Sequence, residues 1–168
     1  GEYAKELLAT AAAAGVAMFE EDERLLCYPS LVRVLPGEAA VEVDRVRDRK
    51  VRPSVLVAAL AAAQQRAPRF RPGQFLDSLY GAYGLVLARE GKSAGAVVRL
   101  LDVWSVLTLL PGQSRDYTRQ EFARDLYLLD QSGEIATRDG ARLRWAASTG
   151  TRGSGVLTTV ARSGQQQR

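Results

Sequence analysis

The segment that decides the fold runs from Thr118 to Trp145 and reads TRQEFARDLYLLDQSGEIATRDGARLRW. Thr118 and Glu121 have the spacing of a capping box, in which each side chain accepts a hydrogen bond from the other residue's backbone N–H. An apolar stripe at helical spacing follows, formed by Phe122, Leu126 and Leu129. The segment therefore predicts a helix that begins at Thr118 and ends near Ser132-Gly133.

A β-hairpin is predicted directly after this helix. Asp139-Gly140 lies between two short runs of alternating character, which is a strong short-range hairpin signal. Because successive side chains of a strand point to opposite faces, Arg142 and Arg144 are expected on one face of the return strand. Leu143 and Trp145 are expected on the other face.

Two further helices are predicted before this segment. After Pro72, apolar residues between 75 and 87 recur at i, i+3 and i+4 steps, which gives one wide apolar face, and Glu90-Gly91-Lys92 ends the helix. The second helix is expected from about Val97 to Leu110, is almost wholly apolar, and is stopped by Pro111-Gly112. The predicted order is therefore three helices and then a hairpin.

This order resembles the winged-helix superfamily of DNA-binding domains over residues 75–148. The resemblance rests on the pattern of elements, without a diagnostic motif. It implies that the helix from Thr118 to Gln131 enters the major groove and that the hairpin from Glu134 to Ala146 touches the adjacent DNA backbone. The connection from Leu110 to Thr118 is longer than the turn of a tight helix-turn-helix.

The side chains expected to contact DNA lie on the predicted third helix and on the hairpin. A helical-wheel projection with Phe122 pointing inward turns four residues of the helix outward. Gln and Arg can pair with adenine and guanine edges, and arginines on a strand face suit phosphate contact. The alternatives are an ordinary solvated helix face and a sheet edge protected by charge. The candidates are Gln120, Arg124, Tyr127 and Gln131 on the outward face, with Arg119, Arg138, Arg142 and Arg144.

The first 71 residues predict a separate α/β subdomain. A helix is expected over 2–14, ending at Gly15. Four β-favouring runs follow, separated by turn residues, at 16–19, 24–28, 31–35 and 39–43. The basic segment Arg45–Arg52 leads into Pro53 and a helix over 55–66. We expect a small antiparallel meander with helices on one face, because so few strands cannot bury a core without helices packed against them.

Charge is segregated along the chain, although the net charge is only +4. Residues 1–44 hold nine acidic and three basic side chains, whereas residues 45–71 hold eight basic side chains and one acidic. The basic segment Arg45–Arg52 could contact phosphates, or pair with the acidic turn Glu20–Glu23 within one subunit or between subunits. The expected division is an α/β subdomain over 1–71, a winged helix over 72–148 and a flexible basic tail over 149–168.

No catalytic, metal or cofactor site is predicted. The chain has no histidine, which removes the commonest general base and zinc ligand, and its single Cys27 sits in an apolar run typical of a buried strand. No apolar run approaches the roughly 20 residues that span a bilayer, so we expect no membrane partner. The usage of cysteine, alanine and arginine favours a cytoplasmic, bacterial protein. The start at Gly1 indicates a piece of a longer protein.

The first functional hypothesis is a non-enzymatic module that binds double-stranded DNA, with arginines contacting phosphates. The alternative is a protein–protein interaction or dimerisation module of a multi-subunit complex, because the tandem, helix-rich layout resembles that of winged helices in chromosome-organising ATPase complexes. The acidic and basic stretches and the apolar run 97–110 suit such an assembly. A third possibility is a fragment of an enzyme whose active site lies outside these residues.

Overall fold

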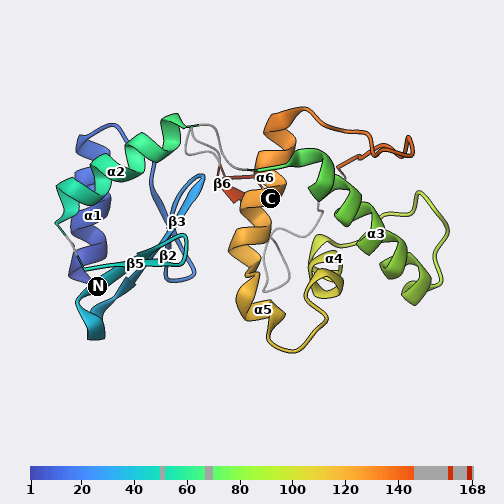
Figure 1. The fold of residues 1–168 in the computed structure, drawn as a ribbon, viewed down its shortest axis with the longest axis horizontal. Helices are drawn as coiled ribbons and strands as arrows, with labels where there is room; N and C mark the ends of the chain where they lie inside the picture. Colours follow the sequence, from blue (N-terminus) through green and yellow to red (C-terminus); the bar gives the residue numbers. More distant parts are fainter. Residues whose placement is uncertain (50–51, 67–69, 146–158, 161–165, 168) are drawn as a thin grey trace. The chain divides into compact units, whose positions relative to one another are not determined.

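The computed structural model describes residues 1–49, 52–66, 70–145, 159–160 and 166–167. The chain divides into two compact units (Figure 1): unit 1 comprises Gly1–Arg69 and Val160–Gln166, and unit 2 comprises Phe70–Thr159 and Gln167–Arg168. A five-stranded antiparallel sheet and six α-helices lie in the described residues, so the predicted α+β class is confirmed. Near the end of the chain, β6 (Thr159–Val160) and β7 (Gln166–Gln167) form a two-stranded sheet.

Unit 1 is an antiparallel meander with a helix at each end. Its strands pair in chain order, β1 with β2 and so on to β5, as predicted for the first four. The fifth strand was not predicted, because it forms within the basic segment Arg45–Arg52. The elements are α1 (Glu2–Ala13), β1 (Phe19–Glu21), β2 (Arg24–Cys27), β3 (Ser30–Leu35), the 3-10 turn η1 (Pro36–Glu38), β4 (Ala40–Val43), β5 (Val46–Asp48) and α2 (Pro53–Gln65).

Two hairpins of unit 1 close with two-residue turns, the first of them tighter than the sequence predicted. Asp22 and Glu23 have φ of 47° and 62°, so β1 extends to Glu21, inside the stretch predicted as a turn. Asp44 and Arg45 have φ of 46° and 70° and form the same kind of two-residue turn between β4 and β5. Aspartate tolerates this left-handed region better than most residues, which suits it to a two-residue hairpin turn.

The core of unit 1 lies between one face of the sheet and the two helices, as predicted. Figure 1 shows α1 and α2 packed beside each other. The buried core residues are Ala4, Leu7 and Ala11 of α1, Leu56, Val57 and Leu60 of α2, and Met18, Leu25, Cys27, Val32 and Val41 of the strand region. Leu7, Val32 and Val41 have no exposed surface.

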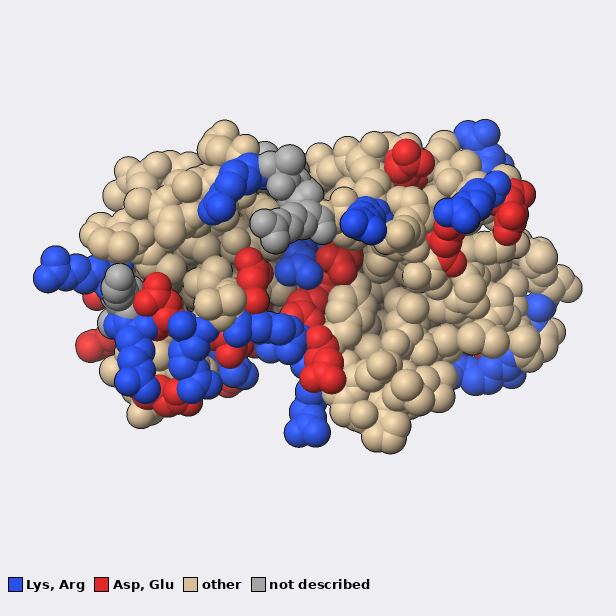
Figure 2. All heavy atoms as spheres, viewed as in Figure 1, with Lys and Arg blue, Asp and Glu red and all other residues tan. Residues whose placement is uncertain are grey.

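Charged side chains on the strands of unit 1 form ion pairs with neighbouring elements. Arg33 of β3 lies opposite Glu42 of β4, with 3.6 Å between the paired atoms. Arg47, which belongs to the basic segment, forms an ion pair with Glu38. Figure 2 shows Lys/Arg and Asp/Glu side chains intermixed over this part of the surface, so the local charge is largely compensated.

The described residues of unit 2 form four helices and a short hairpin. They are α3 (Pro72–Glu90), α4 (Leu100–Leu107), α5 (Gln113–Asp116) and α6 (Arg119–Ser132), followed by the hairpin. The second predicted helix is shorter than expected, since α4 ends at Leu107 and residues 97–99 precede it. The long connection to Thr118 contains the single turn α5. None of the described helices is long and apolar enough to cross a membrane.

The three longer helices of unit 2 meet around Phe122, which has no exposed surface. Its ring makes edge contacts with the rings of Phe75 and Tyr117, at centroid distances of 6.4 and 6.2 Å. The other buried members of this core are Leu76, Leu79, Ala82 and Val86 of α3, Val103 of α4, and Leu126 and Leu129 of α6. The predicted inward stripe of α6 is therefore confirmed.

The predicted capping box is confirmed at the start of α6. The Thr118 hydroxyl accepts a hydrogen bond from the backbone N–H of Glu121 at 3.3 Å, and the Glu121 carboxylate accepts one from the N–H of Thr118 at 2.9 Å. Two N–H groups that the helix leaves without a backbone acceptor are satisfied in this way.

Candidate nucleic-acid interface

The hairpin at the end of unit 2 is short and closes with a three-residue loop. Ala136 and Arg142 form an antiparallel bridge, and the N–H of Thr137 donates to the carbonyl of Ala141 at 2.8 Å. Gly140, the last loop residue, has φ of 86°. This left-handed conformation is the one that a three-residue hairpin loop requires at that place, and glycine adopts it without strain.

Two contacts attach the hairpin to the helices of unit 2. Leu143 is half-buried and packs against the core around Phe122, as predicted from its alternation with the arginines. The carboxylate of Asp77 in α3 accepts a hydrogen bond from the backbone N–H of Arg138 at 3.4 Å. The loop of the hairpin therefore lies beside the first turns of α3.

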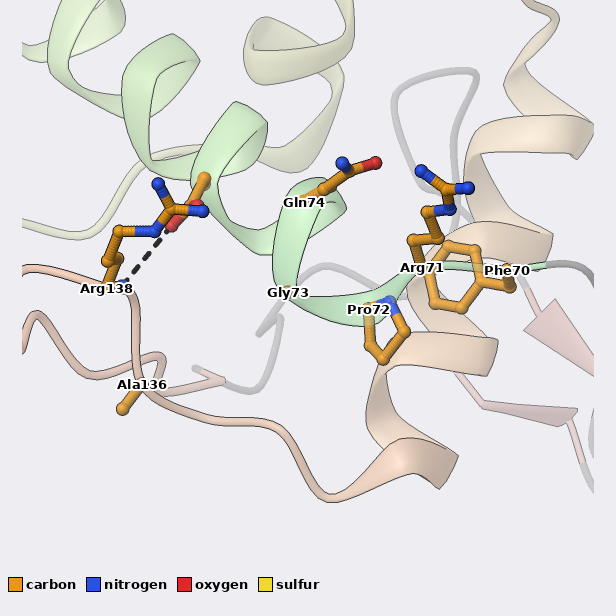
Figure 3. A pocket seen from close by; sticks show the side chains of 8 residues that line it. Phe70, Arg71, Pro72, Gly73, Gln74, Ala136 and Arg138 are labelled. Atoms are coloured by element: carbon orange, nitrogen blue, oxygen red, sulfur yellow. Dashed lines mark hydrogen bonds between the residues drawn. The ribbon is translucent and has the colours of Figure 1, made fainter.

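A hollow of about 600 Å³ opens between the hairpin and the N-terminal end of α3. Arg71, Gln74 and Asp77 line it from the helix side, and Ala136 and Arg138 line it from the hairpin. Figure 3 shows Gln74 between the side chains of Arg138 and Arg71. The hollow thus joins residues that are more than sixty positions apart in the sequence.

The hollow is suited to an anion. Its charged side chains are the guanidinium groups of Arg71 and Arg138 and the carboxylate of Asp77. The first turn of α3 begins with Pro72, and no side chain of the described residues caps it. A helix N-terminus carries a partial positive charge and N–H groups without a helical acceptor, which favours phosphate and carboxylate ligands.

Two exposed arginines of the hairpin follow Arg138 by a few positions in the sequence. Arg142 and Arg144 are both exposed, whereas Leu143 between them faces the core. Trp145 was predicted on the same inner face as Leu143, but 46% of its surface is exposed. The predicted separation of the two hairpin faces therefore holds for Arg142, Leu143 and Arg144.

The predicted reading face of α6 is wrong in part. Tyr127, expected to point outward, is only 7% exposed. Arg124 is half-buried, and its Nε atom lies 3.1 Å from the carboxylate of Asp125. A wheel anchored on a few apolar residues underestimates the buried arc, because the ring of a tyrosine can be buried as readily as an aliphatic side chain.

Asp125 is itself part of a partly buried polar cluster at this face. It accepts a hydrogen bond from the hydroxyl of Tyr117 at 2.6 Å. Burial, followed by the charge of Asp125, raises the pKa of Tyr117 well above its usual value. The indole N–H of Trp104 donates to the carbonyl of Tyr117 at 3.0 Å. Arg124 and Asp125 therefore belong to the structural support of α6.

The remaining α6 candidates are spread along the helix. Arg119 is exposed at its first turn, where the guanidinium lies 5.2 Å from the ring centroid of Trp104. Gln120 is half-buried, and Gln131 is exposed in the last turn, just before the hairpin. At 1.5 Å per residue, about 18 Å of helix separates Arg119 from Gln131. The eight candidates do not form one surface.

Sequence reasoning missed Arg71 and Gln74. The Arg71-Pro72 pair did mark the start of a helix, and a charged residue at that place flanks the helix N-terminus. Arg71 lines the same hollow as Arg138 because the hairpin packs on α3, and this packing has no local sequence signal.

Neither a metal site nor a reactive thiol is present in the described residues. They hold no group of three or more His, Cys, Asp or Glu side chains that could bind a metal ion. Cys27 has no exposed surface, and burial, followed by the charge of Asp44, raises the pKa of its thiol to about 11. In comparisons with known proteins, no family model, curated protein or solved structure matches this chain.

Proposed function

We propose that unit 2 is a non-enzymatic winged-helix module that binds double-stranded DNA through its phosphates. The observation that carries the proposal is the hollow at the N-terminal end of α3, which Arg71 and Arg138 both line. The exposed Arg142 and Arg144 of the hairpin extend the basic surface. In this proposal the helices α3, α4 and α6 are the three helices of the winged helix, and the hairpin is its wing.

Phosphate contact is favoured over base contact, because few of the α6 residues predicted to read bases are free to do so. Arginine side chains and helix N-termini supply many phosphate contacts in protein–DNA complexes. Of the four α6 residues predicted to point outward, Tyr127 is buried and Arg124 pairs with Asp125. We therefore expect affinity for duplexes of any sequence, with at most a modest preference contributed by Gln131.

The proposal is tested by the salt dependence of duplex binding. Each neutralised phosphate contributes about 0.9 to the slope of log affinity against log salt concentration. Four arginine contacts, from Arg71, Arg138, Arg142 and Arg144, give a slope of about −3.6, or a loss of roughly 100-fold between 50 and 200 mM salt. Fluorescence anisotropy with a labelled duplex of about 20 base pairs measures this slope.

Two double variants remove the same amount of charge from different places. Arg71→Gln with Arg138→Gln should reduce the slope by about 2 and weaken binding for every duplex sequence. Arg33→Gln with Arg47→Gln is the matched control, because these arginines pair with Glu42 and Glu38 in unit 1. Equal losses in the two variants, or no binding by the unsubstituted chain at 20 mM salt, would refute the proposal.

A further inference from the structure

The hollow at the N-terminal end of α3 has the volume of a small-molecule site. It measures about 600 Å³, and pockets that enclose a whole small molecule have volumes of about 300–1,000 Å³. All the residues that line it belong to unit 2. The hollow therefore has room for the base and the sugar of a nucleotide as well as for phosphates.

The two arginines of the hollow are available to a ligand. Neither the guanidinium of Arg71 nor that of Arg138 forms an ion pair or a hydrogen bond with another described residue, and both residues are exposed. Figure 3 shows Gln74 between their side chains, so the hollow offers two separate positions for an anion with an amide between them. An internal nucleotide of a DNA strand has the same order of groups, with a phosphate on either side of its base.

Two uncharged side chains of the hollow suit a base. Phe70 is half-buried, and an edge contact with Phe75, at a centroid distance of 5.4 Å, holds its ring in place. Unpaired bases stack on aromatic rings whatever their sequence. The exposed amide of Gln74 can pair with the edge of adenine. The carboxylate of Asp77, which accepts the backbone N–H of Arg138, opposes a phosphate but can also accept a hydrogen bond from a base amino group.

Only an unpaired base can use these contacts fully. In a continuous duplex the flat faces of the bases are covered by their neighbours, and proteins reach only the base edges in the grooves. Moving a base out of the stack costs least where it is already single-stranded. The hollow therefore favours a nucleotide of a single-stranded extension beside the duplex that Arg142 and Arg144 contact.

We propose that the hollow binds one unpaired nucleotide of a DNA strand together with the phosphates on either side of it. Phe70 and Gln74 contact the base. Arg71 and Arg138 contact the two phosphates. This proposal depends on the proposed function, because the hairpin arginines hold the neighbouring duplex. The module then binds a junction between duplex and single strand more tightly than a continuous duplex.

The first test compares extensions with and without bases by fluorescence anisotropy of the full chain. Each probe is a duplex of about 20 base pairs with a short single-stranded extension, on the 3′ or the 5′ side, of deoxyadenosines or of abasic residues. The abasic extension keeps the phosphates and removes the bases. On one of the two sides, the deoxyadenosine probe should bind about tenfold more tightly than the abasic probe, which is within the range for stacking of one base.

The outcomes separate this proposal from the proposed function. If the duplexes bind with the expected salt dependence but the deoxyadenosine and abasic probes bind equally on both sides, the hollow takes phosphates alone and this proposal is overturned. If no duplex binds even at low salt, the proposed function fails, and this proposal fails with it.

The second test assigns the preference for bases to the hollow. Phe70→Leu keeps an apolar side chain against the core but removes the ring, and Gln74→Ala removes the amide at an exposed position; each should lower the preference for deoxyadenosine. Arg142→Gln with Arg144→Gln is the control, because these residues do not line the hollow. This double variant should weaken binding of both probes and retain their ratio. Circular dichroism and urea unfolding check that Phe70→Leu is folded. A preference that survives both Phe70→Leu and Gln74→Ala, or that the arginine variant abolishes, would overturn the proposal.

Discussion

Replacement of Phe122 by alanine tests whether the two units of the chain are separate folding domains. Phe122 is fully buried at the meeting point of α3, α4 and α6, and its ring contacts those of Phe75 and Tyr117. Loss of a buried phenylalanine side chain costs about 3–5 kcal/mol of unfolding free energy. A unit of about 75 residues has a total stability of roughly 4–11 kcal/mol. The substitution should therefore remove about half of the stability of unit 2.

The assay separates the units without cutting the chain. Both tryptophans, Trp104 and Trp145, belong to unit 2, so intrinsic fluorescence reports its unfolding alone. With an m value of about 1.3 kcal/mol/M, a loss of 4 kcal/mol lowers the fluorescence-detected urea midpoint by about 3 M. Far-UV circular dichroism reports both units and should show a second, unshifted transition.

The matched control is Leu60→Ala in the core of unit 1, where Leu60 is 2% exposed. It should cost about 2–5 kcal/mol in unit 1 and leave the tryptophan transition where it was. If Leu60→Ala moves the fluorescence midpoint as far as Phe122→Ala does, the two units unfold as one domain and the reasoning fails.

Three further predictions follow from single side chains. Cys27 should react with iodoacetamide at pH 8 roughly 100-fold more slowly than the unfolded thiol, because its pKa is raised from 9.0 to about 11; rapid labelling without denaturant would contradict its burial. Tyr117→Phe should reduce the alkaline sensitivity of unit 2. Because the pKa of Tyr117 is raised in the folded chain, its contribution to the unfolding free energy is complete below pH 10 and is lost as the pH rises above 10. If the unfolding free energy of Tyr117→Phe falls above pH 10 as steeply as that of the unsubstituted chain, Tyr117 does not cause the alkaline sensitivity. Thr118→Ala should lower unfolding free energy by about 1 kcal/mol through loss of the hydrogen bond to Glu121, whereas Thr118→Ser should retain it, as fluorescence-detected urea unfolding would show.

The predictions from sequence that hold depend on local signals. The capping box at Thr118, the hairpin at Asp139-Gly140 and the meander of unit 1 are each specified by residues a few positions apart. In contrast, the burial of Tyr127 depends on the residues that pack around α6. The strand β5 was missed because its residues were interpreted as a basic segment leading into Pro53, although Val46 pairs with Val43 of β4. The strand propensity of single residues does not indicate which residues of neighbouring strands pair.

The difference between local signals and tertiary packing also explains which residues of the candidate site could be predicted from the sequence. Arg142 and Arg144 could be placed on one face because strand alternation is a local rule, and both are exposed. The hollow that carries the proposed function needs Arg71 and Arg138 together, which only the hydrogen bond from Arg138 to Asp77 and the packing of the hairpin on α3 bring about. The choice of α6 as the binding element came from the winged-helix resemblance and from a wheel projection of its own residues, which could not foresee that Tyr127 is buried.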